Sequence, residues 1–173
     1  ISCLIVEKDR PGLSFGKLED KMGWRAQPTA QVMFDNVRVP AENLLGRAGE
    51  GFRYAMAGLD GGRLNIAACS LGGASEALDR ALEYAREREQ FGQPIVQFQA
   101  TQFKLADMET ELAASRALLY EAARRLDGRD PDATKYCAMA KRFVTDAGFR
   151  IANDALQIHG GYGYLADYEI ERI

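Results

Sequence analysis

Three short stretches of the sequence carry residue types that could bind a ligand. The first, QIHGGYGY at residues 157–164, holds three glycines, two tyrosines and the only histidine of the chain. A helix that ends at two glycines exposes backbone N–H and C=O groups, which suit contact with a flat ring or a phosphate. Glycines also end helices without any ligand, and a lone histidine is more often a packed or capping side chain than a base. This stretch alone leaves both interpretations open.

The second stretch, REREQFGQPIVQFQ at residues 86–99, joins a charged helix end to a turn and a new helix. Composition alone favours a structural explanation, in which glycine stops one helix and proline begins the next. A ligand-binding role for this turn therefore needs support from elsewhere in the chain.

The third stretch, GLDGGRLNIA at residues 58–67, places Asp60 and Arg63 on either side of two helical glycines. An exposed ion pair at this spacing contributes only roughly 0.2–0.5 kcal/mol. Glycines inside a helix each cost up to about 1 kcal/mol relative to alanine. A ligand lying against the helix explains the two glycines better than a surface ion pair does.

The composition is that of a globular protein. The 173 residues are 47% hydrophobic and 27% charged, which excludes disorder and allows one domain, or one domain and part of another. Nucleic-acid binding calls for a basic face, which a net charge of -3 does not suggest, so we expect none. No apolar run is long enough to span a membrane, and no secretory leader is visible. We expect the three cysteines to be reduced, buried thiols; one histidine and unclustered cysteines predict no metal site.

The hydrophobic periodicity changes along the chain. The pattern of residues 1–46 predicts short strands, among them ISCLIV and QVMFDNVRVP. These strands are too few for a complete sheet. From residue 49 the period is that of helices, which we expect at about 50–89, 95–127 and from Pro131 to about 158. A fourth helix should begin in ADYEIERI, residues 166–173.

Each predicted helix carries an apolar stripe for a shared core. The predicted core residues of the first helix are Phe52, Met56, Leu59, Ile66, Leu71, Leu78, Leu82 and Ala85. Those of the second are Phe98, Leu105, Leu112, Leu119 and Leu126. Those of the third are Tyr136, Ala140, Phe143, Ala147, Ile151, Ala155 and Ile158.

These patterns predict a mainly α fold: an up-down antiparallel helical bundle preceded by the last strands of a β domain. We place the end of the β domain at residues 1–46 and an incomplete helical bundle at residues 47–173. Both ends of the sequence look cut through secondary structure. We therefore expect a fragment of a longer chain.

Taken in order, the segments resemble the acyl-CoA dehydrogenase family of flavoproteins. GWRAQPTAQVMFDNVRVPAENLLG is similar to the end of that family's middle β domain, a barrel or sandwich. EREQFG, a glutamine seven residues after its glycine, and DALQIHGGYGY resemble the C-terminal helical bundle. GLDGGRLNIAACSLG resembles the isobutyryl-CoA, short branched-chain type more than the straight-chain type.

The resemblance implies that FAD binds at an interface between subunits. Arg88 would reach the pyrophosphate of a partner subunit's FAD, with Phe91 packing nearby and Gln99 following on the next helix. The glycine-containing stretch would contact the flavin nucleotide across the dimer through Gln157, Ile158, His159, Gly160 and Gly161. His159 would then be a neighbour of the cofactor and not a base.

The resemblance also implies α,β-dehydrogenation of an acyl-CoA thioester, with Asp60 and Arg63 facing the thioester and pantetheine region. In one branch of the family the catalytic glutamate occupies the position of Gly62, which has no carboxylate. In the majority branch it lies in a Glu-Gly motif, here expected beyond Ile173. The resemblance further implies that the family's N-terminal helical domain and the first half of its β domain are missing, so the chain is part of the C-terminal half of a subunit roughly twice as long. We therefore expect no catalytic base in this chain, and no activity from residues 1–173 alone.

The implied partners are an acyl-CoA, an electron-transfer flavoprotein and further copies of the subunit in a homodimer or homotetramer. A bacterial protein of this kind would be cytoplasmic, and a eukaryotic one would lie in the mitochondrial matrix. An acyl-CoA oxidase or a flavin monooxygenase of the same superfamily remains an alternative, distinguished by the oxygen reactivity of its reduced flavin. The third hypothesis is a non-enzymatic helical interaction module, in which Arg88 and Gln99 would be surface residues that can be replaced without loss of function.

Overall fold

The computed structural model describes residues 1–173 as two compact units, Ile1–Ala57 and Gly58–Ile173. The border lies inside a long helix, α1, which runs from Gly51 to Glu87. The predicted domain division into residues 1–46 and 47–173 concerns the whole protein and stays a prediction.

The first unit contains two small antiparallel strand pairs. In one pair β1 (Cys3–Leu4) lies beside β4 (Leu44–Leu45), and in the other β2 (Leu13–Phe15) lies beside β3 (Val32–Phe34). The strands are shorter than predicted, because ISCLIV forms a strand over only two residues and the second half of QVMFDNVRVP forms none. A bend at Asn36, whose φ is 52°, ends the extended conformation.

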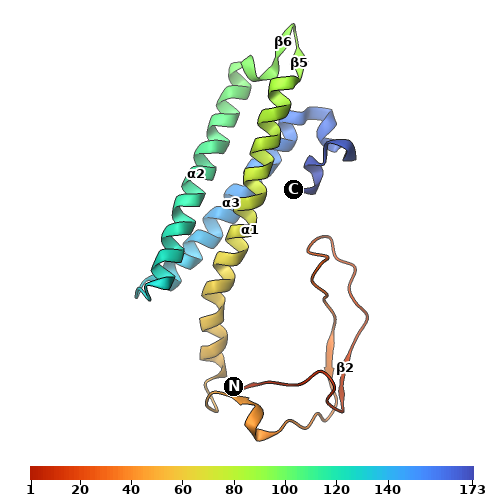
Figure 1. The fold of residues 1–173 in the computed structure, drawn as a ribbon, viewed down its shortest axis with the longest axis vertical. Helices are drawn as coiled ribbons and strands as arrows, with labels where there is room; N and C mark the ends of the chain where they lie inside the picture. The colour runs from red at the N-terminus through yellow and green to blue at the C-terminus, as the bar shows by residue number, and fades with distance from the viewer. The chain divides into compact units, whose positions relative to one another are not determined.

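The second unit is a bundle of three long helices that run alternately up and down (Figure 1). After α1, a tight hairpin of β5 (Glu89–Gln90) and β6 (Gln93–Pro94) leads to α2 (Gln99–Asp127), and α3 spans Ala133–His159. The predicted helical bundle is therefore confirmed.

Small residues let α1 pack closely against its neighbours. Ala77, Ala81 and Ala85 repeat every four residues and are completely buried. On α3, a Cβ placed at Gly148 would lie 3.2 Å from the backbone oxygen of Ser70 on α1. A bulkier residue at this crossing would push the two helices apart.

The core forms two clusters along the bundle. The first joins α1, α2, α3 and the C-terminal turns, and it comprises Ala74, Ala77, Leu78, Ala81, Ala85, Leu105, Met108, Leu112, Ile151, Ala155 and Ile170. The second joins the three helices nearer the start of α3, and it comprises Ala67, Leu119, Ala122, Ala140 and Val144. The predicted stripe of α2 is confirmed at its three central leucines.

The predicted stripe of α1 is wrong at its N-terminal end. Phe52, Met56, Leu59 and Ile66 are exposed, whereas the stripe is buried or half-buried from Leu71 onward. Leu64 and Ala67 of α1 pack in the second cluster, so α2 and α3 already cover this part of the helix. Leu59 and Ile66 lie on a side of α1 that neither helix covers. Phe143 on α3 is exposed for a similar reason, since it points outside both clusters.

Two predicted helix starts are also corrected. The second helix begins at Gln99 and not near residue 95, because Ile95–Gln97 form a 3₁₀ turn and Phe98 is extended, with ψ of 130°. The predicted start of a fourth helix in residues 166–173 was wrong: these residues form two 3₁₀ turns, Ala166–Tyr168 and Ile170–Arg172. Glu169 between them has φ of 55°, a left-handed conformation that interrupts a helix.

The cysteines differ in burial. All three are free thiols, but only Cys137 is buried; Cys3 is half-buried and Cys69 is exposed on α1. The expectation of three buried thiols was therefore wrong for Cys69. Burial raises the pKa of the Cys137 thiol, which makes it unreactive. None of the helices has the length and apolar character needed to cross a membrane.

Candidate functional site

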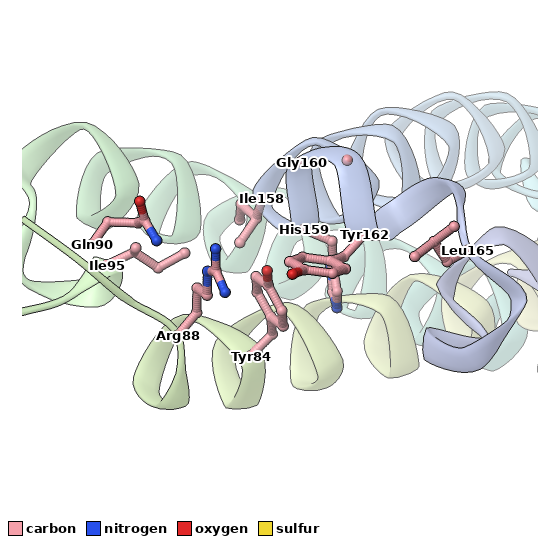
Figure 2. Close-up of a pocket in the computed structure, with 10 residues that line it drawn as sticks. Tyr84, Arg88, Gln90, Ile95, Ile158, His159, Gly160, Tyr162 and Leu165 are labelled. Carbon is pink, nitrogen blue, oxygen red and sulfur yellow. The ribbon is translucent and has the colours of Figure 1, made fainter.

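A cavity of about 420 Å³ lies between the end of α1 and the end of α3 (Figure 2). Its wall combines one cation, aromatic rings, aliphatic side chains and bare backbone. The lining residues are Tyr84, Arg88, Gln90, Ile95, Ile158, His159, Gly160, Gly161, Tyr162 and Leu165.

Arg88 directly follows α1 and is fixed through its backbone. Its N–H donates to the carbonyl of Tyr84 at 2.8 Å, and its own carbonyl accepts from the N–H of Ile95, also at 2.8 Å. The guanidinium carbon lies 5.1 Å from the centroid of the Tyr162 ring, a cation–π contact. Arg88 makes no ion pair with a carboxylate of this chain, so its charge remains available to an anion.

His159, the last residue of α3, is nearly completely buried. Its Nδ1 lies 2.8 Å from the carbonyl oxygen of Ala155, and because that oxygen can only accept, Nδ1 carries a proton and donates it there. The ring stacks on Tyr84 at a centroid distance of 4.4 Å, and Tyr168 meets both rings edge-on. Burial raises the pKa of the Tyr84 phenol, and the nearby charge of Arg88 partly opposes this effect.

The glycines after His159 have two different reasons to be glycine. Gly160 has φ of 59°, which ends α3, and a Cβ at Gly160 or Gly161 would meet no atom within 4 Å. At Gly163 a Cβ would lie 2.6 Å from the carbonyl oxygen of Leu156. Gly163 is thus required by the turn itself, while Gly160 and Gly161 leave backbone uncovered beside the cavity.

The structure brings together five of the eight predicted cofactor residues. Around this one cavity lie Arg88, Ile158, His159, Gly160 and Gly161. Gln157, Phe91 and Gln99 do not line it. Phe91 is 94% exposed at the tip of the β5–β6 hairpin, with φ of 53°, and Gln99 is exposed at the first position of α2. Whether any of the eight contacts a cofactor stays a prediction.

Sequence reasoning missed the aromatic side of the cavity. Tyr84 lies one helical turn before Arg88, and this spacing of four residues was a usable signal. Tyr162 belongs to the glycine-containing stretch, but nothing in its spacing indicated contact with Arg88.

The second predicted site, at Asp60 and Arg63, is an ion pair with a third partner. Arg63 Nη1 lies 2.5 Å from Asp60 Oδ1, and the hydroxyl of Thr134 on α3 donates to Asp60 Oδ2 at 2.6 Å. The Asp60 side chain is only 13% exposed, compared with 32% for that of Arg63. The pair is therefore tied to α3 and is not a free surface ion pair.

The glycines around this pair face a different direction. With about 100° of rotation per residue, Gly58, Gly61 and Gly62 lie roughly 100–160° around α1 from Asp60. A Cβ at any of the three would meet no atom within 4 Å. No packing within this chain explains them, but they also do not form one surface with the ion pair.

The sequence model described as "Acyl-CoA dehydrogenase, C-terminal domain" matches residues 49–173. The chain belongs to the acyl-CoA dehydrogenase family. It is 56% identical to the mitochondrial isobutyryl-CoA dehydrogenase of Dictyostelium discoideum, over 99% of this chain and 41% of that protein. The acyl-CoA dehydrogenase resemblance is thus confirmed.

Solved structures agree. The butyryl-CoA dehydrogenase of Megasphaera elsdenii has a TM-score of 0.93 and 46% identity, over 99% of this chain and 44% of that one. A chain from a structure described as the electron transferring flavoprotein of Acidaminococcus fermentans has a TM-score of 0.93 and 50% identity, over 99% and 45%. The chain spans less than half the length of these relatives.

Proposed function

We propose that the whole protein is an FAD-dependent acyl-CoA dehydrogenase that acts on a short branched acyl-CoA and passes electrons to an electron-transfer flavoprotein. The observation that carries this proposal is a cavity lined both by Arg88 and by the bare backbone of Gly160 and Gly161. The likeness to isobutyryl-CoA dehydrogenase supports the choice of substrate, and the A. fermentans flavoprotein structure supports the choice of electron acceptor.

The residues around the cavity fit a dinucleotide cofactor. Arg88 has no carboxylate partner, so its guanidinium can donate to phosphate oxygens. Gly160 and Gly161 leave room for a ligand to approach the backbone directly. His159 and Tyr162 add aromatic surface next to that backbone. We propose that these residues hold FAD, with Arg88 at its pyrophosphate.

FAD, when bound, supplies the acceptor for the hydride that leaves the β-carbon of the acyl chain. The chain itself orients the reactants. Arg63 retains guanidinium donors that Asp60 does not use, and these suit an acceptor oxygen of the acyl-CoA. Gly62 offers no carboxylate to remove the α-proton, so we assign the base to a part of the protein outside residues 1–173.

We further propose that the cavity receives the cofactor of a second subunit, which makes a homodimer the smallest active form. The exposed hairpin tip with Phe91 supports this proposal, because an aromatic side chain that is 94% exposed suits a contact outside its own chain. A homotetramer built from two such dimers would keep the same site.

Anaerobic mixing of the purified whole protein with isobutyryl-CoA tests the function. The flavin absorbance should bleach, and the α,β-unsaturated thioester should form in equal amount. Rapid reoxidation of the reduced flavin by oxygen, without need of an electron-transfer flavoprotein, would instead identify an oxidase or monooxygenase. A protein purified without flavin, and unable to bind added FAD, would contradict the proposal and favour a helical interaction module.

A further inference from the structure

Thr134, an exposed residue, makes a side-chain hydrogen bond between two helices. It lies at the second position of α3, and its hydroxyl donates to Asp60 Oδ2 on α1 across 74 positions of sequence. The other carboxylate oxygen, Oδ1, accepts from Arg63. Each carboxylate oxygen of Asp60 thus accepts a hydrogen bond from a side chain.

The contact lies where α1 enters the bundle. Cys137, one turn after Thr134 on α3, is completely buried. Besides burial, the charge of Asp60 raises the pKa of this thiol, and the charge of Arg63 lowers it. One turn after Asp60, Leu64 packs against the second core cluster. Core packing therefore holds the two backbones in register, and the Thr134 hydroxyl adds a directional bond to a carboxylate that is mostly buried.

The three side chains differ in what they can offer a ligand. Asp60 is 13% exposed and already accepts two hydrogen bonds, so it is poorly placed to bind substrate. Arg63 is 32% exposed, and only one of its donor groups has a partner in this chain. The exposed guanidinium is the group with unused hydrogen-bonding capacity.

We propose that Thr134 is a positioning residue for substrate binding: it fixes Asp60, and Asp60 fixes the guanidinium of Arg63, which binds an acceptor oxygen of the acyl-CoA. This inference rests on the proposed function. It divides the two predicted substrate residues into a binding residue, Arg63, and an orienting residue, Asp60. Without the hydroxyl, Asp60 gains rotational freedom, and Arg63 loses the single arrangement that suits the ligand.

The test is steady-state kinetics of the whole flavoprotein with isobutyryl-CoA and an electron acceptor. Thr134→Val preserves the side-chain shape and removes the donor. It should raise KM by about three- to tenfold, which matches the loss of one typical hydrogen bond, with kcat and flavin content within about twofold of wild type. Thr134→Ser keeps the hydroxyl and should restore most of the affinity.

Thr145→Val is the matched control. Thr145 lies on the same helix, but its hydroxyl bonds to the carbonyl of Lys141 within α3 at 2.8 Å. The same chemical change there should leave KM unaltered. An equal rise in KM for Thr145→Val and Thr134→Val would show a general effect on the helix and would overturn the proposal.

A double-mutant cycle separates positioning from lost stability. In an Arg63→Ala background, Thr134→Val should change KM no further, because the group that it orients is gone. A full additional effect of Thr134→Val in that background would contradict the mechanism. The inference also fails if wild type oxidises isobutyryl-CoA while Thr134→Val keeps the wild-type KM; absence of flavin reduction in wild type would instead refute the proposed function.

Discussion

Two arginines, one within α1 and one directly after its last residue, are separated by about 37 Å of helix length and offer two kinds of cationic group. Arg63 is paired with Asp60, which Thr134 holds in turn. Arg88 has no carboxylate partner; it lies over an aromatic ring beside a cavity. In the Asp60–Arg63 ion pair, the held carboxylate fixes the direction of the guanidinium donors and reduces the net charge. The unpaired guanidinium of Arg88 keeps its full charge.

The difference indicates two ligand chemistries. A full positive charge beside bare backbone suits phosphate oxygens, which carry negative charge. A guanidinium neutralised by a carboxylate suits an uncharged acceptor such as an amide or thioester carbonyl. The comparison thus supports the proposed assignment of Arg88 to FAD and of Arg63 to the acyl-CoA.

Removing Arg63 should have the largest effect on substrate binding. Arg63→Ala deletes a charged donor and leaves Asp60 with an uncompensated, mostly buried charge, so KM for isobutyryl-CoA should rise by about 10- to 100-fold. The flavin content should not change. Steady-state kinetics with an electron acceptor measure the first quantity, and absorbance of the purified protein measures the second. Loss of flavin from this variant would contradict the assignment of Arg63 to the acyl-CoA and of Arg88 to FAD.

Gly163→Ala tests which glycines near Arg88 serve the fold. The new Cβ would meet the carbonyl oxygen of Leu156 at 2.6 Å, so the turn must shift, at a cost of about 1–3 kcal/mol in stability. Gly161→Ala is the control, since its Cβ would meet nothing within 4 Å. Thermal unfolding should show a lower midpoint for Gly163→Ala alone. Gly161→Ala should instead weaken FAD binding; equal midpoints for the two variants would refute this division.

Gly148→Ala probes the close crossing of α3 and α1 at Ser70, between the positions of the two arginines. Its Cβ would lie 3.2 Å from the carbonyl oxygen of Ser70, and we expect a loss of about 1 kcal/mol in the free energy of unfolding. Chemical denaturation of the variant and of wild type measures this loss. A stability equal to or above that of wild type would show that α1 and α3 can move apart without cost.

Tyr84→Phe should have the smallest effect, confined to alkaline pH. Burial raises the pKa of Tyr84 above its ordinary value near 10 in the folded protein. A raised pKa stabilises the folded state fully below the unfolded value, and this stability is lost as the pH rises through the folded pKa. Above about pH 10, the thermal midpoint of wild type should therefore fall more steeply than that of Tyr84→Phe. Parallel pH profiles would contradict this account.

Local patterns in the sequence predicted most of the helical unit. The leucines at positions 105, 112 and 119 predicted the buried face of α2, and the glycines at 160 and 161 predicted the end of α3. Both features depend on residues within a few turns of each other, which periodicity and capping rules describe well.

Contacts between distant residues were not predictable in this way. No spacing rule connects Thr134 to Asp60, because the bond depends on how two helices pack. The exposure of Leu59 and Ile66 has the same origin, since periodicity marks an apolar face without saying what covers it. The left-handed conformation of Glu169 prevents a helix where one was predicted, and helix propensity is too weak a signal to anticipate it.

The most direct test of the account compares FAD affinity in apo-protein prepared from Arg88→Ala, Arg86→Ala and Arg63→Ala. Arg86 is an exposed cation two residues before Arg88 and controls for the general loss of charge. The dissociation constant for FAD should rise by about 10- to 100-fold for Arg88→Ala and stay within about twofold for the other two variants. Similar dissociation constants for all three variants would contradict the assignment of Arg88 to the cofactor.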